Sequence, residues 1–181
     1  MMDGTRRSFD LEAIRADFPI LSREVHGKPL VYLDSAASAQ KPAQVLDALM
    51  SAYQDTYANV HRGLHFLSEA STDLYEAVRG KVAGFIGAAS GDEIVLTSGA
   101  TMSLNLIARC WAQPRLQPGD EILISIAEHH ANIVPWQMVA EATGARVRAF
   151  TLENDGAFSM ARLKAEMSEH TRIISVPHVS N

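Results

Sequence analysis

Short strand-like runs alternate with helix-like runs through the second half of the sequence. The strand-like runs lie at residues 94–97, 121–126, 146–152 and 172–176, and segments with helical spacing separate them. Such alternation is typical of βαβ units, in which right-handed crossovers connect the strands of a mainly parallel sheet. The sequence therefore predicts an α/β fold with helices flanking the sheet.

Turn signals agree with this alternation. Residues 118–120 (Pro-Gly-Asp) and 154–156 (Asn-Asp-Gly) have turn composition, Pro135 suits the start of a helix, and Gly144 suits its end.

The first half of the sequence predicts mostly helices. Asp10 can cap a short helix, and the apolar run 30–33 then predicts a strand. Pro42 suits the first turn of a second helix. A longer helix should run from about residue 67 to 85 and end at Gly87.

Composition limits the classes of function. The 16 Lys and Arg residues are scattered and the formal net charge is -5, which argues against a nucleic-acid partner. The sequence holds no window near the roughly 18 uninterrupted apolar residues of a membrane span, and its start has no apolar signal core, so we expect a cytoplasmic protein without membrane attachment. Cys110, the only cysteine, lies in a mostly apolar helix-like run and is predicted to be a buried structural thiol.

The segment 97–101, Thr-Ser-Gly-Ala-Thr, separates a strand-like run from a helix-like run. Unpaired backbone N–H groups at such a helix start could hold a phosphate, with the Thr101 hydroxyl as an extra donor. The alternative is an ordinary turn in which Thr101 caps the helix. A Walker loop is excluded because no Gly-Lys-Ser/Thr follows.

The segment 128–136, Glu-His-His-Ala-Asn-Ile-Val-Pro-Trp, lies where a strand should end and a helix begin. Sites in open α/β sheets lie at this position. Adjacent side chains diverge, so only one of His129 and His130 should face a given pocket, where its ring could stack on a planar cofactor and move protons. A hydrogen-bonded loop histidine is the alternative. Asn181 should lie at the same sheet edge, where its amide could bind a substrate carboxylate or a cofactor ring substituent.

Two histidines four residues apart, His61 and His65, could bind a metal from one helix face. Gly63 weakens a helix there, and no glutamate completes the zinc-protease pattern. We therefore predict no metal site, and interpret Arg62 and the two histidines as a polar loop near an anionic ligand.

Four segments, 32–42, 59–63, 128–136 and 178–181, resemble in order and spacing the pyridoxal-phosphate-dependent cysteine desulfurases of the SufS and CsdA type, in the class V aminotransferase family. The resemblance covers nearly the whole chain. It implies the large domain of a fold-type-I (aspartate-aminotransferase-like) enzyme, incomplete in this chain. Residues 1–34 would form an N-terminal arm with the first strand of the small-domain side, and 35–181 the N-terminal portion of the cofactor-binding domain.

The resemblance also implies roles for individual residues. His129 would stack over the pyridine ring and act in catalysis, and Asn181 would lie near the ring and the substrate carboxylate. Ala100 and Thr101 would form the phosphate cup. The substrate-binding residues would be Ala36, His61, Arg62 and Asn181.

The activity implied is that of a transferase in L-cysteine metabolism. A homodimeric enzyme would convert L-cysteine to L-alanine, with pyridoxal phosphate as electron sink and a separate cysteine thiolate taking the sulfur as a persulfide. A sulfur-acceptor protein would then carry the sulfur toward iron-sulfur cluster assembly or another sulfur-transfer pathway.

The chain departs from this family pattern in two ways. Residues 98–102 read Ser-Gly-Ala-Thr-Met in place of the usual Arg-Gly-Thr-Thr-Glu, which removes one hydroxyl and two charges. No lysine follows Asn181, and the family's Schiff-base lysine and persulfide cysteine have no counterpart here. The chain is therefore expected to be an N-terminal fragment, cut at an unfinished sheet edge, and inactive by itself.

Two alternatives remain open. The complete protein could be another class V enzyme, such as a selenocysteine lyase, an aminotransferase-like enzyme or an epimerase. It could also be a non-catalytic paralogue that binds a partner through the helix at 67–85.

Overall fold

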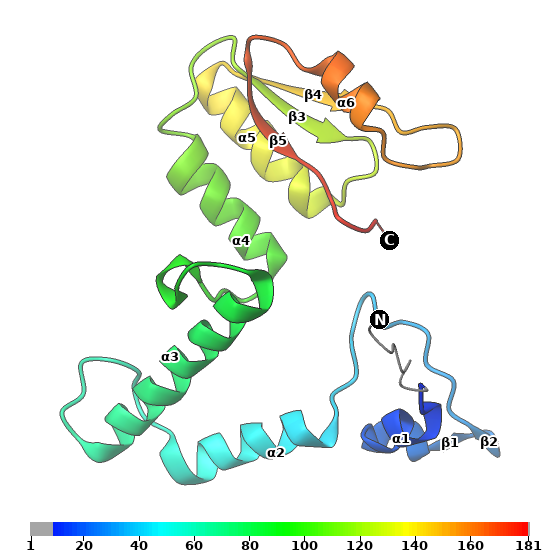
Figure 1. Cartoon of the computed structure of the whole chain (residues 1–181), viewed down its shortest axis with the longest axis vertical. Coiled ribbons are helices and arrows are strands. Elements are labelled where there is room, and N and C mark those ends of the chain that lie inside the picture. Colours follow the sequence, from blue (N-terminus) through cyan, green and yellow to red (C-terminus); the bar gives the residue numbers. More distant parts are fainter. Residues whose placement is uncertain (1–8, 181) are drawn as a thin grey trace, which may run out of the picture. The chain divides into compact units, whose positions relative to one another are not determined.

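The computed structural model describes residues 9–180, and its contacts divide the chain into two compact units, Met1–Val95 and Leu96–Asn181 (Figure 1). Each unit has its own helices and its own sheet. The predicted boundary between residues 34 and 35 stays a prediction.

The first unit is mainly helical. α1 begins after Asp10, whose carboxylate accepts the Ala13 N–H at 3.0 Å, as predicted. The long helix α3 ends at Gly87, which adopts the left-handed conformation (φ 76°) that favours glycine. The elements are α1 (Leu11–Ala16), η1 (Pro19–Ser22), β1 (Glu24–Val25), β2 (Lys28–Pro29), α2 (Ala43–Ser51), η2 (Ala52–Thr56), α3 (Phe66–Ile86) and η3 (Gly91–Glu93).

Two predicted strands are wrong. Within the described residues, neither the run 30–33 nor the run 94–97 pairs with another strand, and the hairpin of the first unit is instead formed by β1 and β2. Leu33 is 91% exposed and Val95 is 70% exposed. β-branched and apolar residues favour an extended backbone, but a strand also requires a neighbour to complete its hydrogen bonds.

The second unit contains a three-stranded parallel sheet, as the alternation predicts. The strands are β3 (Glu121–Ser125), β4 (Arg146–Phe150) and β5 (Thr171–Ser175), in the order β4-β3-β5. Ile122 lies opposite Val147 on one side and Ile173 on the other. The helical segments are α4 (Ala100–Leu106), which continues as η4 (Ile107–Ala112), then η5 (His130–Asn132), α5 (Val134–Thr143) and α6 (Met160–Glu166).

Helices cover both faces of this sheet. On one face Ile122 and Ile124 pack with Trp136 and Val139 of α5, and Ala108 of η4 joins them. On the other face Leu123 and Phe150 pack with Leu163 of α6. Burial of each large apolar side chain contributes about 1.5–3 kcal/mol, so the three apolar runs that helices cover form the strands of this sheet.

The prediction of a buried Cys110 is wrong, because the thiol is exposed. Ala108 and Ala112 on the same helical segment are fully buried. Cys110 lies between them in sequence and therefore projects from the opposite face of the segment. None of the helices in residues 9–180 combines the length and apolar character needed to cross a membrane.

Candidate functional site

A cavity of about 580 Å³ lies at the carboxyl ends of β3 and β5. Three segments of the second unit line it, from within residues 100–104, 127–132 and 175–180. The chain leaves central β3 for β4 on one side and then reaches β5 on the other. Ligands of open α/β sheets bind at such points, where strand order reverses.

The start of α4 forms one wall of the cavity. Gly99 precedes the helix with φ 136° and ψ 172°, a conformation that is essentially restricted to glycine, and no side chain caps the helix there. The alternative role of Thr101 as the cap is therefore wrong, because Thr101 is the second residue of the helix. The N–H groups of the first turn have no partner within the helix, so Ala100 and Thr101 present the donor set that suits a phosphate.

His129 also lines the cavity, on the segment that directly follows β3. Its Nδ1 accepts the backbone N–H of Ala131 at 3.1 Å, which caps η5. The ring of His130 is turned by 89° from that of His129, and of the two only His129 lines this cavity. The structure thus places Ala100, Thr101 and His129 around one cavity.

Some of the residues that line the cavity take part in a set of hydrogen bonds that we call the polar relay. Its members are Glu128, Asn132 and Ser175, which line the cavity, together with Ser125 and Trp136. Glu128 accepts from Ser125 Oγ at 2.8 Å and from Asn132 Nδ2 at 2.7 Å. Asn132 Oδ1 accepts from Trp136 Nε1 at 2.8 Å and from Ser175 Oγ at 2.7 Å. The relay therefore joins the ends of β3 and β5 to α5.

Sequence reasoning missed the relay. The spacing of Glu128, Asn132 and Trp136, each four residues from the next, could have indicated a shared face, but the serines come from two strands whose pairing is not local. Ser180 Oγ also donates to the Ala127 carbonyl at 2.8 Å, which ties the third lining segment to the first loop. Asn181 lies outside the described residues, and its predicted roles stay predictions.

The other predicted site residues belong to the first unit. Ala36 lies in a turn that the Ser38 N–H closes by donating to the Asp34 carbonyl at 3.0 Å. His61 and Arg62 both adopt the left-handed conformation, with φ of 61° and 57°. Their roles in substrate binding stay predictions.

Contacts from α3 hold His61 in its left-handed conformation. Its backbone N–H donates to Thr72 Oγ1 at 2.9 Å, and its Nε2 lies 2.9 Å from a carboxylate oxygen of Glu76. This hydrogen bond, and then Arg79, lower the pKa of Glu76. His65 instead caps α3 through Nδ1, so the two imidazoles have separate partners.

Comparison with known proteins agrees with the resemblance. Residues 31–181 match the sequence model of the family described as aminotransferase class-V. The chain is 52% identical over 174 residues to a cysteine desulfurase of Pectobacterium atrosepticum, covering 96% of this chain and 43% of the relative. It is 51% identical over 168 residues to a probable cysteine desulfurase of Synechocystis, covering 93% and 40%. The chain thus spans about two fifths of the length of these curated relatives.

Solved structures show the same likeness. Cysteine desulfurase CsdA from Escherichia coli superposes with a TM-score of 0.77 at 43% identity, covering 92% of this chain and 40% of that one. The apo cysteine desulfurase from Thermococcus onnurineus gives 0.84 at 34% identity, covering 94% and 40%. A more distant structure, 19% identical with a TM-score of 0.73, shares the fold and carries glycine covalently linked to its pyridoxal-phosphate cofactor.

The predicted family, fold class and cofactor are confirmed. The match to the family model covers most of the chain, and the α/β arrangement with its parallel sheet is that of the fold-type-I relatives. The chain therefore belongs to the class V aminotransferase family, whose members use pyridoxal phosphate.

Proposed function

We propose that this chain is the N-terminal part of a cysteine desulfurase that converts L-cysteine to L-alanine. The observation that carries the proposal is the cavity at which the uncapped start of α4, His129 and the segment after β5 meet. Identity near 50% to curated cysteine desulfurases supports the substrate. The complete enzyme would be a cytoplasmic homodimer that passes sulfur, as a protein persulfide, to an acceptor protein for iron-sulfur clusters or another sulfur-transfer pathway.

The start of α4 would hold the cofactor phosphate. Ala100 and Thr101 contribute backbone N–H donors, and the Thr101 hydroxyl adds a further donor. Ser98 and Met102 carry no charge, so the phosphate would be held by backbone dipoles and hydrogen bonds without an ion pair from these two positions.

His129 would stack on the planar ring and move a proton. Pyridoxal phosphate supplies an electron sink when bound, and an imidazole beside it can exchange protons near neutral pH. Asn181, Ala36, His61 and Arg62 would contact the substrate, with the amide and guanidinium groups suited to its carboxylate.

A fusion protein tests the proposal. This chain would replace the matching 174 residues of the Pectobacterium atrosepticum relative, and alanine and sulfide released from L-cysteine would be measured with pyridoxal phosphate present. We expect catalytic turnover by the fusion and none by the 181-residue chain alone. A fusion that folds and binds the cofactor but releases no alanine would overturn the proposal, as would turnover by the isolated chain.

The departure at residues 98–102 is the one observation that favours another class V enzyme. Assays of the complete enzyme would discriminate between a cysteine desulfurase and another class V enzyme, because the complete enzyme carries its own remaining site residues. Alanine formation from L-selenocysteine at a far higher kcat/KM than from L-cysteine would indicate a selenocysteine lyase. Amino-group transfer without sulfide release would indicate an aminotransferase-like enzyme.

A further inference from the structure

The hydrogen positions of the polar relay are determined by its chemistry. Trp136 Nε1 can only donate and the Glu128 carboxylate can only accept. Asn132 lies between them, so its Oδ1 must face Trp136 at 2.8 Å and its Nδ2 must face Glu128 at 2.7 Å. Ser175 must then donate to Asn132 Oδ1. The buried Asn132 side chain thus has one allowed orientation.

The relay is coupled to His129 through the short turn η5. The Asn132 N–H donates to the His129 carbonyl at 2.8 Å, and the Ala131 N–H donates to His129 Nδ1 at 3.1 Å. A ring nitrogen that accepts a hydrogen bond carries no proton. The neutral imidazole therefore carries its proton on Nε2.

We propose that Asn132 is a positioning residue that holds neutral His129 in the Nε2–H tautomer. Anchoring Asn132 to α5, β5 and Glu128 fixes the end of η5, and the fixed turn aims the Ala131 N–H at His129 Nδ1. In this tautomer Nε2–H is the ring's hydrogen-bond donor, and the basic lone pair lies on Nδ1, where protonation would break the cap. The catalytic meaning of this tautomer rests on the proposed function, whereas the tautomer itself does not.

An exchange of amide and carboxylate tests the relay. Asn132→Asp places two carboxylates against each other at the position of the 2.7 Å contact and removes the donor to Glu128. Glu128→Gln alone leaves the hydrogen bonds possible, because the new amide can donate to Ser125 and accept from Asn132. In the double variant the amide introduced at position 128 donates to the carboxylate introduced at position 132. That carboxylate still accepts from Trp136 and Ser175, so every hydrogen bond is restored. Ser175→Ala removes a single donor and gives a milder second test.

The readout is the tautomer ratio of each histidine, from nitrogen-15 NMR of the ring nitrogens of the chain, at a pH about two units above the ordinary histidine pKa of about 6.5. We expect Asn132→Asp to lower the Nε2–H to Nδ1–H ratio of His129 about threefold to tenfold, as expected for loss of one hydrogen bond. Ser175→Ala should lower it less, and Glu128→Gln and the double variant should keep the wild-type ratio. His130, outside the relay, serves as the internal control.

The outcomes separate this inference from the proposed function. An unchanged His129 ratio in Asn132→Asp, or no restoration in the double variant, would overturn the inference. If Asn132→Asp does not fold, the Ser175→Ala ratio decides, and an unchanged value would overturn it. Failure of the fusion to bind pyridoxal phosphate would instead contradict the proposed function and leave the tautomer result standing.

Discussion

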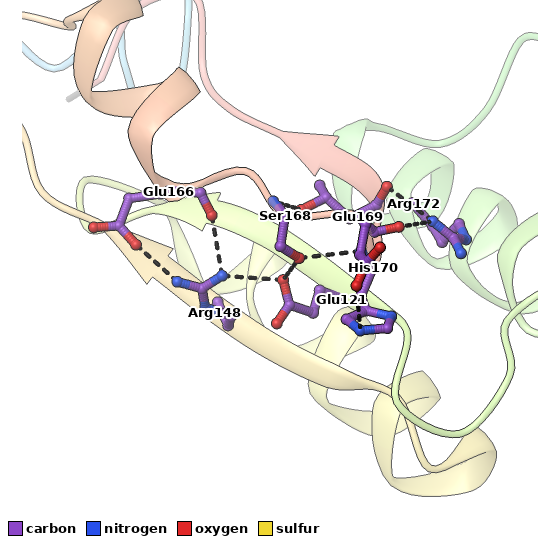
Figure 2. Close-up of polar contacts among 8 residues, drawn as sticks. Glu121, Arg148, Glu166, Ser168, Glu169, His170 and Arg172 are labelled. Atoms are coloured by element: carbon purple, nitrogen blue, oxygen red, sulfur yellow. Dashed lines mark hydrogen bonds and ion pairs between the residues drawn. The ribbon is translucent and has the colours of Figure 1, made fainter.

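The two ends of the three-stranded sheet in Leu96–Asn181 are built from different chemistry. At the carboxyl end, a cavity is lined mostly by uncharged groups, and Glu128 is the one carboxylate among its lining residues. Toward the amino end lies what we call the ion-pair cluster, made by Glu121, Arg148, Glu166 and Ser168 (Figure 2). Arg148 lies 3.0 Å from Glu121 and 2.8 Å from Glu166, and Ser168 Oγ donates to Glu121 at 2.7 Å.

We infer from this difference that the carboxyl end serves ligand binding and that the ion-pair cluster serves stability. The cluster ties β3 and β4 to the end of α6 and to the segment between α6 and β5, and its charged groups already have partners. The hydrogen bond from Ser168, and then that from Arg148, lower the pKa of Glu121. The carboxyl end keeps helix N–H groups without a side-chain cap. Changes there should affect ligand binding and catalysis, and changes in the cluster should affect stability alone.

The largest effect is expected from His129→Ala in the fusion enzyme. Positioned acid-base groups contribute about 10²–10⁴-fold to rate, so kcat should fall by about a hundredfold or more. His129→Ala also removes the side-chain cap of η5, so the free energy of unfolding should fall by about 0.5–2 kcal/mol. Steady-state alanine release checks this, with His130→Ala as the matched control. An equal loss of kcat in the two variants would show that His129 has no special role in catalysis.

A backbone change at the carboxyl end comes next. A side chain on Gly99 meets open space, but φ 136° is a conformation that only glycine adopts readily. Gly99→Ala should therefore destabilise the chain by about 1–3 kcal/mol, measured by urea unfolding, and weaken cofactor binding by the fusion. Gly84→Ala, inside α3 with open space around it, is the matched control and should be neutral or stabilising. A stable Gly99→Ala variant with unchanged cofactor affinity would contradict the role of this turn.

The cluster should show itself in the pH dependence of stability. Because the folded-state pKa of Glu121 is lowered, its contribution is present above the unfolded-state value of about 4.3 and is lost as the pH falls through the folded-state value. Glu121→Gln should lower the melting temperature at neutral pH and reduce its fall on acidification, without changing cofactor affinity. Glu141→Gln, at an exposed position on α5, is the control. An altered cofactor affinity in Glu121→Gln would show that the ion-pair cluster influences the cofactor cavity, which would contradict the separate roles of the two ends of the sheet.

The smallest effect is expected from restoring an acidic residue at position 102. Met102 is half exposed in the first turn of α4. Met102→Glu should raise the free energy of unfolding by about 0.3–1 kcal/mol through the helix dipole. Thermal unfolding checks this, with Met102→Gln as the uncharged control. A decrease relative to the Met102→Gln variant would show that the helix start already faces negative charge.

The sequence predicted the parts of this unit that depend on local pattern. β3, β4 and β5 are apolar runs because helices cover the sheet. His129 follows β3, and Ala100 begins a helix directly after Gly99. Pairing is not local, which is why the run 30–33 was wrongly predicted as a strand. The relay was missed for the same reason, since Ser175 meets Asn132 only because β5 lies beside β3.

Titration of the 181-residue chain with pyridoxal phosphate tests the central claim most directly. The backbone N–H signals of Ala100 and Thr101 and the ring signals of His129 would be followed by NMR, together with those of Arg148 and Ser168 in the ion-pair cluster. We predict saturable shifts at Ala100, Thr101 and His129, with the cluster unchanged. Shifts confined to the cluster, or none at the carboxyl end at saturating cofactor, would contradict the assignment of this cavity as the cofactor site.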